Sequence, residues 1–74
     1  MRYEVGFFIP YRVDKIEGWK EKLERDIKRI DGAIEELGLP PSYNSSLEAT
    51  KAAQMIKEHL GNLEIITQIS VEPA

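Results

Sequence analysis

The residue types that could carry catalysis or hold a metal are few in this chain, and their spacing supports neither. His59 is the only histidine, and the chain contains no cysteine. A catalytic or metal-binding imidazole needs converging partners, but the sequence has no H-E-x-x-H or paired-histidine spacing. We therefore interpret His59 as a structural or solvated residue.

The serines and glycines also lack a recognisable motif. No serine stands in G-x-S-x-G, and helix capping accounts directly for Ser45 or Ser46. The five glycines are scattered singly, so neither a P-loop nor a dinucleotide-binding loop is present. We therefore expect a protein that is not an enzyme and that uses no cofactor and no metal.

The length and the charge of the chain exclude further classes of protein. A chain of 74 residues makes a single domain with a marginal core, which small folds usually reinforce with disulfides, a metal or oligomerisation. Without cysteines, and with one histidine, oligomerisation is the remaining route. The net charge of −3 argues against a nucleic-acid binder. No segment is long and apolar enough for a membrane span or a signal peptide, and we expect a soluble, cytoplasmic protein.

Two segments have the alternating pattern of half-buried strands. Apolar and other residues alternate over Arg2–Ile9, and Pro10 should end the pairing. The β-branched alternation over about Leu63–Val71 predicts a second strand near the C-terminus.

Two helices are predicted between these strands. Asp14 and Glu17 fit a capping box for a helix from about Lys15 to Leu37, with Gly38 as its left-handed stop. Its apolar residues are spaced by three and four and form one stripe. The stripe consists of Ile16, Trp19, Leu23, Ile27, Ile30, Ile34 and Leu37.

The second helix follows the loop GLPPSYNSS. Ser45 and Glu48 form its capping box, and Gly61 ends it. Alanines on its inner side allow a close approach to the strands or to the first helix, while Trp19 and the isoleucines of the first helix should supply most of the buried volume.

The order of elements predicts the architecture. Strand, helix, helix, strand gives an α+β fold, a two-layer β-α-α-β sandwich with two antiparallel strands and both helices on one face. A two-stranded sheet is rarely stable alone, and consecutive apolar residues, Phe7–Ile9 and Ile65–Ile66, should lie at its edges. We expect two copies to join edge to edge about a two-fold axis, which would complete a four-stranded sheet in a homodimer.

The first helix is strongly charged, and its charges are sorted by sign. The basic flank contains Lys15, Lys22, Arg25 and Arg29, the acidic flank contains Glu17, Glu21, Glu24, Asp31 and Glu35, and the exceptions are Asp26, Lys28 and Glu36. The pairs Glu21–Arg25 and Glu24–Lys28 have the favourable acidic-first i,i+4 order, which accounts for many of these charges in a solvated face. The alternative is a docking surface in which Lys22, Arg25 and Arg29 meet an acidic partner.

Four further residues are candidates for partner binding. The prolines of the interhelical loop could present Tyr43 to a partner, or the loop could simply connect two helices. Tyr11 and Arg12 follow the first strand and are either a solvated turn or a contact. Phe8, together with Ile66, should lie on the sheet face away from the helices.

We therefore hypothesise a small, non-enzymatic interaction or regulatory module that acts as a homodimer and contacts another protein. The alternative is a small-molecule-binding or enzyme-accessory module with a ligand groove at the subunit interface, where Tyr11, Arg12 and Tyr43 supply polar contacts.

Overall fold

The computed structural model describes all 74 residues and shows a small α+β fold. Its elements are β1 (Tyr3–Phe8), a 3-10 turn η1 (Val13–Lys15), α1 (Trp19–Glu36), α2 (Ser46–Leu60) and β2 (Gln68–Pro73). The two strands pair antiparallel, from Tyr3 opposite Pro73 to Phe8 opposite Gln68. The predicted element order and strand orientation are confirmed.

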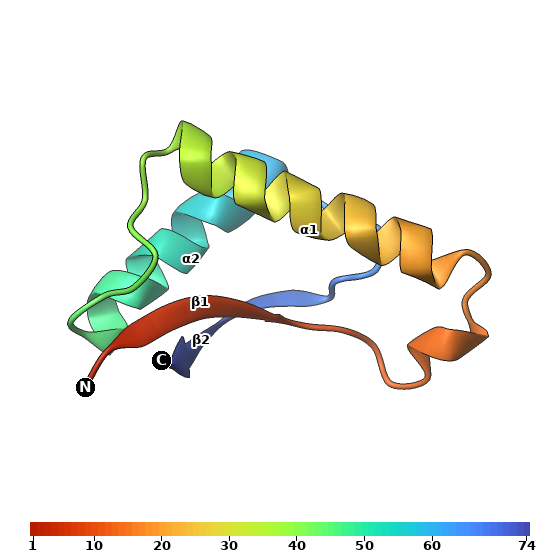
Figure 1. Cartoon of the computed structure of the whole chain (residues 1–74), viewed down its shortest axis with the longest axis horizontal. Helices are drawn as coiled ribbons and strands as arrows, with labels where there is room; N and C mark the ends of the chain where they lie inside the picture. The colour runs from red at the N-terminus through yellow and green to blue at the C-terminus, as the bar shows by residue number, and fades with distance from the viewer.

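Both helices lie on the same side of the two strands (Figure 1). Helix α2 packs against both β1 and β2, whereas α1 packs against α2. The N-terminal end of α1 extends beyond the paired part of the strands (Figure 1). Neither helix is of the length and apolar character needed to cross a membrane.

The core is small and sits between α2, the strands and the inner face of α1. Small side chains let α2 approach closely, and Ile56 is completely buried among them. The buried apolar residues are Ile30, Ala33, Tyr43, Ala49, Ala52, Ala53, Ile56, Ile65, Ile66 and Ile69. Trp19 is only half-buried and is absent from this core, so the prediction that it supplies much of the buried volume is wrong. It lies at the overhanging end of α1, where no strand covers it.

Helix α1 begins later than predicted. Asp14 lies inside η1, and the N-cap residue of α1 is Gly18, which has no side chain to cap the helix. Gly18 has φ 72°, a left-handed conformation that glycine adopts without steric cost and that separates η1 from α1. The other predicted ends are confirmed. Ser45 Oγ accepts a hydrogen bond from the Glu48 amide, and Gly38 and Gly61 have positive φ.

The second strand is displaced toward the C-terminus. The predicted strand began at Leu63, but β2 begins at Gln68, and Ile65 and Ile66 are both buried rather than alternating. The amides of residues 64–66 donate to the Asp26 carboxylate, which takes them away from a ladder. Ile66 therefore lies in the core, and the prediction that it shares the open sheet face with Phe8 is wrong.

Candidate interaction site

The outer edge of β1 is paired at one residue only. Tyr3 exchanges two backbone hydrogen bonds with Tyr43, its amide donating over 2.8 Å and its carbonyl accepting over 2.7 Å. In an antiparallel ladder the outward-pointing residues alternate with those that bond the partner strand. The amide and carbonyl groups of Val5 and Phe7 therefore point away from β2, as those of Tyr3 do.

Large apolar side chains are exposed along the same stretch. Phe7 is 36% exposed, Phe8 53% and Ile9 41%. Ile9 extends past the ladder because β2 has no residue opposite it. Continuing the alternation of β1 by one step gives the main-chain groups of Ile9 the same outward orientation. We call the outward-pointing groups of Val5, Phe7 and Ile9 the β1 edge.

The outer edge of β2 is less open. Its outward-pointing residues are Ile69, Val71 and Pro73, and Pro73 has no amide hydrogen to donate. Ile69 is only 7% exposed, and Val71 packs against the core. Of the two edges, the β1 edge therefore offers more free donors and more exposed apolar surface to a partner strand.

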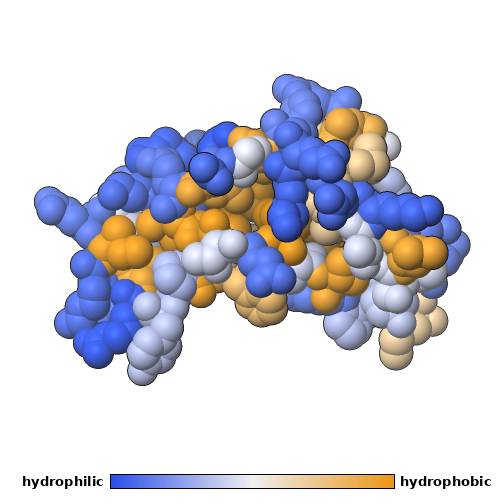
Figure 2. Space-filling model, turned by 180° about the vertical axis from the view of Figure 1, so that it is seen from behind, coloured by the Kyte–Doolittle hydropathy of each residue, from blue (hydrophilic) through white to orange (hydrophobic).

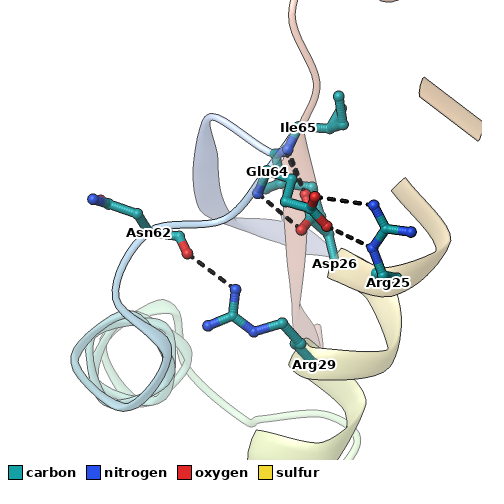
Figure 3. Close-up of polar contacts among 7 residues, drawn as sticks. Arg25, Asp26, Arg29, Asn62, Glu64 and Ile65 are labelled. Carbon is teal, nitrogen blue, oxygen red and sulfur yellow. Dashed lines mark hydrogen bonds and ion pairs between the residues drawn. The ribbon is translucent and has the colours of Figure 1, made fainter. Parts of the chain in front are cut away.

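A buried carboxylate organises the segment that leads into β2. Asp26 is fully buried and accepts hydrogen bonds from the amides of Glu64 (2.9 Å), Ile65 (2.6 Å) and Ile66 (3.0 Å). Figure 3 shows the Asp26 side chain pointing from α1 into this turn of the chain. Burial on its own would raise the pKa of Asp26, but the three amides and the charge of Arg29 outweigh it and hold the pKa below its ordinary value. Asp26 is thus the charged anchor of the segment.

Two residues of the basic flank strengthen this anchor from outside. Arg25 forms a two-pronged ion pair with Glu64, with Nε–Oε2 at 2.8 Å and Nη2–Oε1 at 3.0 Å. The hydrogen bond from Arg25, together with its charge, lowers the pKa of Glu64. Arg29 donates to the carbonyl oxygens of Leu60 (2.8 Å) and Asn62 (3.0 Å), and the second of these bonds is drawn in Figure 3. Arg29 therefore caps the C-terminal end of α2.

The charged helix is thus partly a contact surface, but the contacts observed are with its own chain. Arg25 pairs with Glu64 rather than with Glu21, the i,i+4 neighbour expected from the sequence. Glu24 and Lys28 do form their expected pair, at 3.3 Å. Lys22 is half-buried and forms no ion pair.

The remaining candidate residues differ in how far they are exposed to solvent. Tyr11 is 94% exposed and Arg12 is exposed with a left-handed φ of 63°, both in the turn after β1. Tyr43 is only 8% exposed, and burial raises the pKa of its hydroxyl. Its ring is packed in the core with Ala49 and Ala52 and is not presented to a partner.

The interhelical loop is held in place by contacts at the start of the chain. Arg2 donates from Nε to Ser42 Oγ at 2.7 Å and from Nη1 to Asn44 Oδ1. These bonds accompany the backbone pairing of Tyr3 with Tyr43 and seat the loop against the first residues of β1. The loop thereby covers the outer side of β1 at Tyr3 and leaves the β1 edge open.

A second feature lies at the end of α2. Seen from behind, the molecule exposes a band of apolar side chains between hydrophilic ones (Figure 2). A cavity of about 390 Å³ is formed by the C-terminal end of α2 and the segment leading into β2, with Lys57 as its only charged residue. It is lined by Lys57, Leu60, Gly61, Asn62, Leu63, Ile66, Thr67, Gln68 and Ile69. None of Tyr11, Arg12 and Tyr43 contributes to it.

The role of Asp26 was missed by reasoning from the sequence, although a signal existed. Asp26 lies between Leu23 and Ile30 on the apolar stripe of α1, three residues after one and four before the other. A carboxylate on a core-facing stripe must find hydrogen-bond donors, which predicts a buried anchor rather than an exception to the sorted charges.

Comparisons with known proteins found no relative, so the function is inferred from the geometry of this chain. No protein-family model matches the chain, and no curated protein or solved structure matches it significantly. The structure also contains no group of three or more histidine, cysteine, aspartate or glutamate side chains arranged to hold a metal ion.

Proposed function

We propose that the chain is a small, non-enzymatic interaction or regulatory module that works as a homodimer. Two copies join through the β1 edge, so that their two-stranded sheets combine into one sheet of four strands. The exposed helix surfaces and the open sheet face then remain available for another protein.

The observation that supports this proposal best is the open β1 edge. A two-stranded sheet is marginal alone, and an edge with unpaired main-chain groups and exposed apolar side chains favours the addition of a strand. Here the internal cap provided by Tyr43 stops at Tyr3, while Phe7, Phe8 and Ile9 are exposed beyond it. Pairing would satisfy the main chain and bury these side chains at the same time.

Light scattering on the purified chain tests the proposal. The wild type is expected to have twice the 8.5 kDa mass of one chain, and Phe7→Lys is expected to have the mass of one chain. A lysine at an edge disfavours strand addition because its charge would have to be buried beside a second copy. Leu47→Lys is the matched control, since Leu47 is 64% exposed on α2 and is not one of the residues of the β1 edge. A wild type with the mass of one chain at every concentration contradicts the proposal.

The cavity at the end of α2 favours a second candidate, a small-molecule-binding or enzyme-accessory module. Four apolar residues and one ammonium group would suit an apolar ligand that carries a negative charge. The fluorescent probe anilinonaphthalene sulfonate has this chemistry and should bind saturably, with weaker binding to Lys57→Glu. Lys51→Glu, which changes an exposed lysine of the same helix, should bind as the wild type does. Non-saturable binding, or equal binding to both variants, would exclude this candidate.

A further inference from the structure

The β1 edge also restricts how two copies can pair, an inference that rests on the proposed homodimer. When one strand pairs with its own copy about a two-fold axis, the two strands run antiparallel and the same residues serve both sides. Only outward-pointing groups can form the new hydrogen bonds. Because Tyr3 already bonds Tyr43, these groups belong to Val5 and Phe7 of β1 and to Ile9, which directly follows the strand.

We infer that the two-fold axis of the homodimer passes beside Phe7, so that Phe7 pairs with Phe7 of the second copy and Val5 pairs with Ile9 of the second copy. In this register the three outward-pointing residues of each strand are all used. Each of the three residue pairs across the axis exchanges two hydrogen bonds. Tyr3 and Tyr43 keep their bridge.

Neighbouring registers pair fewer of the outward-pointing main-chain groups. With the axis at Gly6, Val5 meets Phe7 of the second copy, but Ile9 of the second copy falls opposite Tyr3, whose groups are occupied by Tyr43. With the axis at Phe8, Val5 falls opposite Tyr11, beyond Pro10 and within the turn that follows β1. The register centred on Phe7 is therefore the one that pairs the whole edge without breaking an existing bond.

The side chains agree with this register on the face of the sheet toward the helices. There Val5, Phe7 and Ile9 of each copy meet one another, while Tyr3, a further apolar residue on that face, stays paired with Tyr43. On the opposite face, Phe8 lies across from Gly6 of the second copy, where the Glu72 carboxyl group of that copy occupies the space over the glycine. The Phe8 ring, which is 53% exposed in one copy, therefore lies beside this carboxyl group.

The absence of cysteine from the chain allows a direct test with single cysteines. Under mild oxidation Phe7→Cys should form a covalent dimer for most of the protein, because the two Cα atoms at the axis lie about 5.5 Å apart, within disulfide range. Val5→Cys and Phe8→Cys should remain mostly uncross-linked, since neither meets itself across the axis. The double variant Val5→Cys with Ile9→Cys should cross-link again.

A distance measurement keeps the test independent of any change at Phe7. Spin labels on Glu4→Cys report the distance between position 4 of one copy and position 4 of the other. With the axis at Phe7 these positions are six residues apart along the paired strands, which gives a Cα–Cα distance of about 20 Å at about 3.3 Å per residue. An axis at Gly6 would bring this distance to about 13 Å by the same rise. A homodimer by light scattering that cross-links at another position, or gives the shorter distance, overturns the register while the proposed dimer stands. A protein that light scattering shows as a single chain overturns both.

Discussion

Asp26 Oδ2 and the amide nitrogen of Ile65 are 2.6 Å apart, although 39 positions separate the two residues in the chain. The amides of Glu64 and Ile66 also donate to the same carboxylate, so one side chain of α1 fixes the segment that leads into β2. This contact sets where β2 can begin, and therefore where its ladder with β1 ends, at Phe8 opposite Gln68.

Replacing Asp26 with asparagine should strongly destabilise the fold. The amide nitrogen of asparagine would face backbone donors in a fully buried position, so at least one donor would lose its acceptor. We expect the free energy of unfolding to fall by about 3 kcal/mol, as for other buried charged groups that lose a partner. Urea denaturation measures this loss. Asp31→Asn, at an exposed position of the same helix, should change stability by less than about 0.5 kcal/mol.

The same carboxylate makes stability depend on acidic pH. The folded-state pKa of Asp26 lies below its usual value near 3.8, so the folded protein binds this proton less readily than the unfolded chain does. The stabilisation is complete above the usual pKa and is lost as pH falls through the lower, folded-state pKa. Unfolding curves at several acidic pH values should therefore show a steeper loss of stability for the wild type than for Asp26→Asn. Parallel pH dependence of the two proteins would show that this group does not carry the effect.

Arg29 should contribute to stability through the carbonyl groups that it caps. Arg29→Ala removes two hydrogen bonds to the end of α2 and to Asn62, and a loss of about 1 kcal/mol is expected because both bonds are exposed to solvent. Lys28→Ala, which removes only a surface pair with Glu24, should cost about 0.5 kcal/mol or less. Thermal unfolding of the two variants compares them. Equal stability of the two would mean that Arg29 acts only as a solvated charge.

The two tyrosines proposed as partner contacts should differ in how much their replacement by alanine lowers stability. Tyr43→Ala removes a buried ring and should lower the free energy of unfolding by about 3 kcal/mol. Tyr11→Ala removes a ring that is 94% exposed and should change stability by less than about 0.5 kcal/mol. Chemical denaturation measures both. A clearly destabilised Tyr11→Ala would contradict the exposed position of the Tyr11 ring in the turn after β1.

Local signals predicted much of the fold. Several signals act within a few residues, so the sequence reveals them directly. They are the alternation over β1 and the proline that follows it, the Ser45 cap, and the glycine with positive φ after α2. The late start of α1 is less apparent, because Asp14 and Glu17 have the spacing of a capping box, while the left-handed Gly18 interrupts the helix that they would begin.

Contacts between distant residues account for the larger error in β2. Leu63–Thr67 has the alternation and the β-branched side chains of a strand, but the amides of residues 64–66 bond a carboxylate 38 to 40 positions earlier instead of a neighbouring strand. The same kind of contact gives Arg25 and Arg29 partners within the chain that the sequence did not predict. Periodicity identifies which residues are buried, but the partner that satisfies a buried polar group is determined by the tertiary fold.

Amide hydrogen exchange at different protein concentrations tests the β1 edge most directly. The amides of Glu4, Gly6 and Phe8 face β2 and should be protected to the same degree at every concentration. The amides of Val5 and Phe7 should be protected only at concentrations where two copies associate, and Phe7→Lys should abolish the difference at Val5. Val5 and Phe7 amides that exchange at the same rate across the whole concentration range would contradict the β1 edge as the site of self-association.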